Sequence, residues 1–232
     1  MRLTTTLLVV LLLPPVVSAG ERVLLDESFS GDTIPKSWRP GGHKHSFSVI
    51  EGVLRGVAAP GDRHGPSIGV PIQGHDLLLE FDLKFAKPGY FLCLIDGDSQ
   101  FRGQAHLLRF SATKTRVDLM QDRGDPVSKR KQKQQRDRNG GKRIRPTRSQ
   151  LADPSFYRIE RLAHHSATAW DGKWHHVTIQ LRGNHVTATF DSARLSATGT
   201  VLDVKKSRLV FLVAQTADVR LDNVKLWSLS KR

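Results

Sequence analysis

The sequence predicts an all-β fold, an antiparallel two-sheet jelly-roll sandwich with one long basic loop insertion. Three observations support this prediction. Short runs alternate apolar and polar residues with a period of two, which is the pattern of half-buried strands. Gly, Pro, Asn and Asp separate these runs, as turns require. The sequence shows no sustained helical period, so we expect about ten or eleven short strands.

The N-terminal residues have the order of an export signal. Arg2 provides a positive start, residues 7–13 form an unbroken apolar run, and Val17, Ser18 and Ala19 stand at the cleavage position. The apolar run is much shorter than the roughly 20 residues that span a bilayer. We therefore predict a signal peptide at 1–19, a single domain at 20–232, no transmembrane segment after cleavage, and a secreted or periplasmic protein.

The expected strands follow one another along the chain. Residues 47–54 contain two strands with a turn at Glu51 and Gly52. Residues 77–85 alternate cleanly, and Asp222 with Asn223 interrupts the last strand as a β-bulge would. Residues 96–98, Asp-Gly-Asp, read as a turn. The remaining strands are expected at 90–95, 106–110, 115–121, 175–181, 186–190, 209–214 and 219–227.

Cysteine usage excludes an intramolecular disulfide, because Cys93 is the single cysteine of the chain. Its neighbours in residues 90–95 are all apolar, so we expect Cys93 to pack in the core.

The net charge of +14 is concentrated in one segment. Between residues 129 and 148 there are ten Lys or Arg and a single acidic residue, Asp137. Such a composition buries too little apolar surface to order itself, which predicts a disordered basic insertion at 124–150. The candidate polyanion-binding residues are Lys129, Arg130, Lys131, Lys133, Arg136, Arg138, Lys142, Arg143, Arg145 and Arg148.

Two sequence blocks resemble known domains. Residues 170–179, Trp-Asp-Gly-Lys-Trp-His-His-Val-Thr-Ile, and the closing strand at 219–227 resemble the G-K-W-H-x-V-x-I hairpin and last strand of laminin G-like and concanavalin A-like domains. The order G-V-L-x-G, E-F-D-L-K-F and F-L in residues 52–92 is similar to the bacterial 3-keto-disaccharide hydrolase-like domain, which is grouped with family 16 glycoside hydrolases. The resemblance implies a concanavalin A-like jelly roll that binds or processes carbohydrate.

The catalytic residues of that group cannot be identified in this chain. Family 16 enzymes carry three acids on one strand, E-x-D-x-x-E, with two carboxylates roughly 5 Å apart. Glu80 and Asp82 match the first two and share a strand face, but no third acid follows. A solvated strand face, with Lys84 as counter-charge, is the alternative interpretation. If the protein is an enzyme, we expect a glycoside-processing hydrolase or lyase.

A jelly roll offers a concave sheet on which polar side chains bind sugar hydroxyls and apolar or aromatic groups contact the ring. The substrate-binding residues predicted on this basis are Glu80, Asp82, Arg109, Arg116, Asp118 and Asp122.

Metal and cofactor sites are not predicted. The adjacent pairs at 164–165 and 175–176 would point to opposite faces of a strand, so neither pair can chelate one ion. His43 and His45 lack a metal-binding motif around them. Asp96 and Asp98 offer two oxygen ligands for calcium, but a full set of oxygen ligands is not visible nearby.

Two classes of function remain open from the sequence. The first is a carbohydrate-binding or carbohydrate-processing protein. The second is a non-enzymatic interaction protein whose basic loop binds an anionic polysaccharide or an envelope surface through counterion release. Nucleic acid is not the expected partner, because the basic segment lacks the aromatic side chains that stack on bases.

Overall fold

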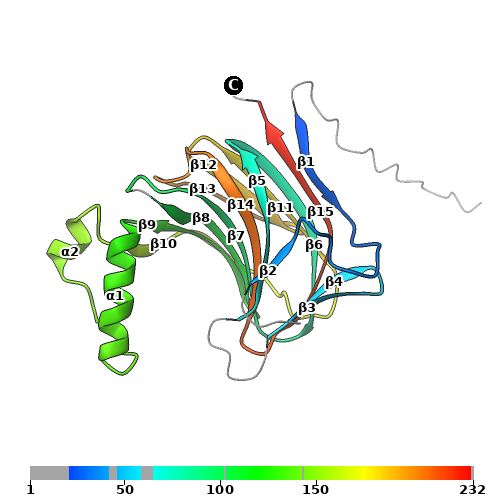
Figure 1. Cartoon of the computed structure of the whole chain (residues 1–232), viewed down its shortest axis with the longest axis horizontal. Coiled ribbons are helices and arrows are strands. Elements are labelled where there is room, and N and C mark those ends of the chain that lie inside the picture. The colour runs from blue at the N-terminus through cyan, green and yellow to red at the C-terminus, as the bar shows by residue number, and fades with distance from the viewer. Residues whose placement is uncertain (1–20, 42–45, 59–64, 102, 143, 231–232) are drawn as a thin grey trace, which may run out of the picture.

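The computed structural model describes residues 21–41, 46–58, 65–101, 103–142 and 144–230, which form fifteen strands and two helices. Figure 1 shows two layers of strands bent in the same sense, with both helices to one side. The strands form two antiparallel sheets, so the predicted jelly-roll sandwich is confirmed. The expected signal peptide lies outside the described residues. Within them, neither helix is long and apolar enough to cross a membrane.

The eight-stranded sheet, here called sheet A, contains the first and last strands. Its order is β13 (Ala193–Thr198), β12 (His185–Phe190), β11 (His175–Arg182), β6 (Asp76–Lys87), β15 (Asp218–Leu229), β4 (Val53–Val57) and β3 (Phe47–Ile50), with β1 (Arg22–Glu27) also paired to β15.

The seven-stranded sheet, here called sheet B, packs against sheet A. Its order is β10 (Arg158–Ser166), β9 (Arg116–Arg123), β8 (Gln104–Ala112), β7 (Tyr90–Asp98), β14 (Lys206–Ala214), β5 (Ser67–Gly74) and β2 (Arg39–Gly41).

The core fills the space between the inner faces of the sheets. Four rings from both sheets meet there: Phe81 lies 5.3 Å from Phe211 and 5.9 Å from Phe91 between ring centroids, and 6.4 Å from Phe110. Each is fully buried, which stabilises the fold by roughly 1.5–3 kcal/mol per side chain. Cys93 lies in this core as predicted, and burial raises the pKa of its thiol.

The strands predicted from alternation are present, but the predicted number of ten or eleven is too low, because β1, β2, β5, β10 and β13 were not predicted. One predicted turn is also wrong. β6 follows the expected period of two, and β11 pairs with β12 through a turn at Gly183 and Asn184. The ladder of β15 shifts register after Asp222, as the predicted bulge requires. The expected turn at residues 96–98 is wrong, because β7 continues to Asp98 and the chain turns only at residues 99–103.

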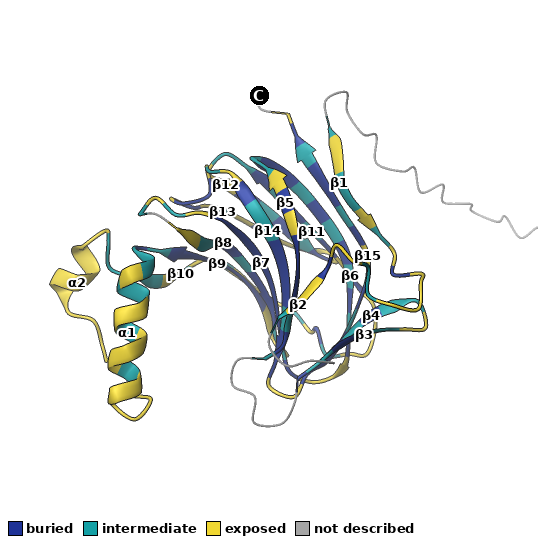
Figure 2. Ribbon diagram, viewed as in Figure 1, coloured by how far each residue is buried: buried dark blue, intermediate teal, exposed yellow. Residues whose placement is uncertain are grey.

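The predicted basic loop is not confirmed, because this segment contains helices α1 (Pro126–Arg138) and α2 (Arg148–Ala152). Asp125 caps α1 by accepting a hydrogen bond from the Val127 amide, and Pro126 begins the helix. Lys, Arg and Gln are good helix formers, so α1 can form without burying any residue. Figure 2 shows most of α1 exposed.

Candidate binding face on sheet B

Side chains on the outer face of sheet B form an apolar floor separate from the main core. Leu92 and Leu94 of β7 and Val210 of β14 are its buried members, each less than a tenth exposed. Three partly exposed side chains pack around them: Tyr90, Met120 and Leu212. In Figure 1 the strands of this sheet curve so that the face opens toward the side where α1 stands. The sheet that carries the floor is therefore curved.

Asp122 on β9 is the centre of a buried polar cluster beside this floor. Arg109 of the neighbouring strand β8 binds both of its carboxylate oxygens, with Nε and Nη2 at 2.5 and 2.8 Å. Lys129 of α1 donates to Oδ2 at 3.1 Å, and the Tyr157 hydroxyl donates to the same oxygen at 2.8 Å. The Lys129 ammonium also lies 4.8 Å from the centre of the Tyr157 ring. One carboxylate thus orients two cations.

The charge state of Asp122 follows from these contacts. Burial raises its pKa, but the hydrogen bonds and charge of Arg109, with the charges of Lys129 and His106, lower the pKa below its ordinary value overall. Burial and the Asp122 charge raise the pKa of Tyr157. Asp122 is therefore a carboxylate and Tyr157 a neutral hydroxyl at neutral pH.

Asp118, two residues before Met120 on β9, is the centre of a second cluster. Arg116 Nε donates to Oδ2 at 2.9 Å, and Ser111 Oγ donates to the same oxygen at 3.4 Å. Arg161 of the edge strand β10 places Nε 2.9 Å from Oδ1. These two atoms form an ion pair but not a hydrogen bond, so Oδ1 is buried without a hydrogen-bond donor among the described residues. A second buried carboxylate therefore also lies between two cations.

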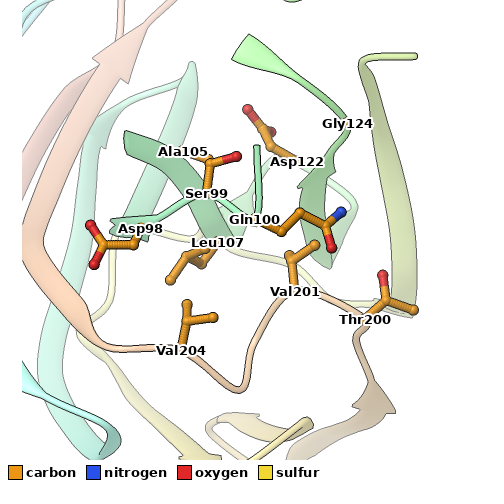
Figure 3. Close-up of a pocket in the computed structure, with 10 residues that line it drawn as sticks. All are labelled: Asp98, Ser99, Gln100, Ala105, Leu107, Asp122, Gly124, Thr200, Val201 and Val204. Atoms are coloured by element: carbon orange, nitrogen blue, oxygen red, sulfur yellow. The ribbon is translucent and has the colours of Figure 1, made fainter. Parts of the chain in front are cut away.

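Asp96 is the third buried carboxylate of this region. It lies at the end of β7, and its Oδ1 is 2.6 Å from His106 Nδ1. Nearby, a small hollow is lined by the turn after β7, the end of β9 and residues 200–204. Figure 3 shows Asp122 at one side of this hollow and Gln100 directed toward Thr200. Asp122 thus lines this hollow and also binds Arg109.

The predicted substrate-binding residues fall on two different sheets. Arg109, Arg116, Asp118 and Asp122 lie together on β8 and β9 of sheet B, whereas Glu80 and Asp82 lie on β6 of sheet A. The structure therefore does not bring all six to one surface. Asp82 instead binds His176 Nδ1 at 2.8 Å and accepts from Asn223 Nδ2 at 2.7 Å. Burial, and then the charge of Asp82, raise the pKa of the neighbouring Asp222.

The two histidines of the family-like block bind different carboxylates. His175 is buried, stacks on Phe190 with ring centroids 4.6 Å apart, and places Nδ1 2.7 Å from Asp191. His176 points instead to Asp82. The opposite directions predicted for adjacent strand residues are confirmed here.

Of the candidate polyanion-binding residues that the structure describes, Lys129 alone joins the buried cluster. Lys131, Lys133 and Arg138 project from α1 into solvent, and Arg143 lies outside the described residues. The remaining members of the set are placed on or after α1: Arg130 and Arg136 on α1, Lys142 and Arg145 between the helices, and Arg148 at the start of α2.

Sequence reasoning missed Tyr157, Arg161, His106 and Ser111. Period-two spacing does place Ser111 on the same face as Arg109. Tyr157 and Arg161 reach the site only because β10 pairs with β9, and a bulge after Arg161 sets its register. A single sequence carries no local signal for that pairing.

The arrangement suits binding better than hydrolysis by two carboxylates. A general acid needs a carboxyl that holds its proton near neutral pH, which calls for a raised pKa. Among the described residues of this face, each of the three buried carboxylates is bound to a basic side chain, and the pKa of Asp122 is lowered. The side chains instead present fixed N–H and O–H donors around an apolar floor.

Comparisons with known proteins agree on the architecture. The chain matches no family model, and no curated protein matches it in sequence. Among solved structures, the laminarinase from Rhodothermus marinus is similar with a TM-score of 0.61 at 9% identity, over 91% of this chain and 98% of that one. The β-glucanase of Bacillus licheniformis has a TM-score of 0.54 at 10% identity, over 89% of this chain and 98% of that one.

A third similar structure is the GlcNAcα1-4Gal-releasing endo-β-galactosidase from Clostridium perfringens, with a TM-score of 0.56 and 10% identity. The match covers 93% of this chain but spans only 64% of that enzyme. These likenesses show that the chain has the two-sheet jelly-roll fold of those three enzymes. The narrower resemblance to the 3-keto-disaccharide hydrolase-like domain stays a prediction.

Proposed function

We propose that this protein binds carbohydrate on the outer face of sheet B and does not hydrolyse it. The observation that carries the proposal is the apolar floor around Leu94 bordered by donors that Asp118 and Asp122 hold in place. Sugar sites combine an apolar or aromatic surface for the ring face with a few fixed polar groups for the hydroxyls. Tyr90 supplies a partly exposed aromatic ring at the floor.

The fold neighbours support the choice of ligand class. They are named as a laminarinase, a β-glucanase and an endo-β-galactosidase, which act on polysaccharides. On the basis of these neighbours we propose carbohydrate as the ligand of this chain. On the basis of the sequence of residues 1–19 we propose that the protein is exported to a secreted or periplasmic location. We do not propose hydrolysis for this chain, because each buried carboxylate described on this face is bound to a basic side chain.

The test is glycan binding measured beside product release. The mature protein is screened on a glycan array, the best ligand is titrated by calorimetry, and reducing ends are assayed on the same sample. We expect binding without product. Tyr90→Ala should weaken binding about tenfold, which corresponds to about 1.4 kcal/mol of lost ring contact.

A matched control lies on the other sheet. Glu80→Gln combined with Asp82→Asn changes polar residues of β6, on sheet A, and should leave the affinity unchanged. The proposal is wrong if this double variant abolishes binding while Tyr90→Ala retains it, or if no glycan binds. Release of reducing ends that depends on Asp118 or Asp122 would show that the protein is an enzyme.

A second candidate function rests on α1. This helix buries none of its residues and exposes Lys131, Lys133 and Arg138, so it can attract a polyanionic surface. We propose it as an alternative attachment site for anionic glycan or an envelope surface. Changing Arg130, Lys131 and Lys133 to Gln tests this while leaving Lys129 on Asp122.

For this candidate we expect retention of the wild-type protein on heparin that falls with moderate salt, and weaker retention of the triple variant. Equal retention of the two proteins would contradict it.

A further inference from the structure

The Arg–Asp pairs of this protein have two different geometries. Arg109 binds Asp122 through Nε and Nη2, and Arg55 binds Asp218 through the same two atoms at 3.0 and 2.5 Å. Both are two-point pairs, in which one edge of the guanidinium is occupied by the carboxylate.

The pairs around Asp118 differ. Arg116 donates a single hydrogen bond to Asp118, from Nε to Oδ2, and the ion pair of Arg161 with Asp118 joins Nε to Oδ1 at 2.9 Å. Within the described part of the chain, the Nη atoms of both guanidinium groups have no acceptor. Both side chains are 48% exposed, while Asp118 is 2% exposed. The two free ends therefore face solvent beside one buried anchor.

Charge and geometry together favour an anionic ligand. Two permanent cations share one carboxylate, so the cluster keeps a net positive charge at neutral pH. Because both guanidinium groups lie against the same buried carboxylate, the two cations are neighbours on this face. Paired guanidinium donors bind an oxyanion through charge-assisted hydrogen bonds, which are stronger than those to a neutral hydroxyl.

We propose that Arg116 and Arg161 form an oxyanion subsite on the outer face of sheet B, which takes the acidic group of an anionic polysaccharide. This inference rests on the proposed function, because it names the class of sugar bound there. A uronate carboxylate and a sulfate ester share the required chemistry. Asp118 is a positioning residue that fixes the arginines without touching the ligand.

The experiment compares three ligands on the whole mature protein. Calorimetry measures binding of an oligouronate, a sulfated oligosaccharide and a neutral β-glucan oligosaccharide of similar length, for the wild type and the Arg116→Gln/Arg161→Gln variant. We expect the wild type to bind one or both acidic ligands more tightly than the neutral one. The double variant should lose about tenfold or more in affinity for the acidic ligand. It should lose less affinity for the neutral ligand, because a guanidinium group forms weaker hydrogen bonds to a hydroxyl than to an oxyanion.

Two further variants keep the test decisive. Removing both arginines leaves Asp118 buried and unpaired, so the triple variant with Asp118→Asn repeats the measurement without that buried charge. Arg116→Lys with Arg161→Lys retains the charge but loses the forked donors, and should recover only part of the acidic preference. The α1 variant, with Gln at 130, 131 and 133, controls for general attraction of polyanions.

The outcomes separate the inference from the proposed function. Equal affinity for acidic and neutral ligands, or an acidic preference that survives in the double and triple arginine variants, overturns the subsite while glycan binding stands. Loss of the acidic preference in the α1 variant alone also overturns it. Failure of every glycan to bind overturns the proposed function itself.

Discussion

Replacing Arg109 by Met tests the buried cluster around Asp122. The change removes two charge-assisted hydrogen bonds from a carboxylate whose side chain is 2% exposed. Breaking a buried ion pair costs about 3–5 kcal/mol. Lys129 and Tyr157 still donate to Asp122, so we expect the lower end, about 3 kcal/mol of lost unfolding free energy. For a domain of this size that lowers Tm by roughly 6–12 °C.

The assay is urea unfolding followed by tryptophan fluorescence. Arg123→Met is the matched control, because Arg123 lies 4.0 Å from the partly exposed Glu160 and should cost less than about 1 kcal/mol. Equal losses in the two variants would refute the reasoning.

The Arg109→Met variant also tests how the stability of the fold depends on pH. Because the pKa of Asp122 is lowered in the folded protein, the stability from this group is complete above the unfolded-state pKa near ~4 and is lost as the pH falls through the folded-state value. Arg109→Met lacks that contribution. The stability gap between wild type and variant should therefore be widest at neutral pH and should narrow below about pH 4. A gap independent of pH would show that Asp122 is not the cause.

Three further predictions follow. Asp125→Ala removes the cap of α1 and should weaken that helix by about 1 kcal/mol, seen as faster amide exchange in α1 but not in β9. Gly124→Ala places a Cβ 2.7 Å from Tyr157 Cα at a φ of +99°, so it should lower Tm by several degrees, more than Gly103→Ala in an open turn. Cys93 should resist a thiol reagent until denaturant unfolds the core, and reaction in the native protein would contradict its burial.

Local sequence pattern was sufficient for most strands. The alternation in β6 and the Gly183-Asn184 turn between β11 and β12 are short-range features, so their positions could be predicted from neighbouring residues alone.

Long-range pairing could not be predicted in this way. Whether Asp82 shares a surface with Asp122 depends on β6 pairing with β11 and β15 while β9 pairs with β8 and β10. Those contacts join residues far apart in the chain and leave no periodic trace in either strand. The sequence therefore predicted the residues of β8 and β9 in the candidate site, but wrongly grouped Glu80 and Asp82 with them.

The prediction for the basic segment was wrong for a different reason. The lack of apolar residues predicts disorder, but a helix of Lys, Arg and Gln forms from intrinsic propensity and end caps. Asp125-Pro126 at the start and Gly140-Gly141 at the end were helix-boundary signals in the sequence. Weighing these signals would have predicted α1.

Amide hydrogen exchange with and without a bound oligosaccharide tests the central claim most directly. If the ligand lies on the outer face of sheet B, protection should increase in β7, β8 and β9 and remain unchanged in β6 and β11. Protection confined to β6 and β11 would move the site to sheet A and contradict the account.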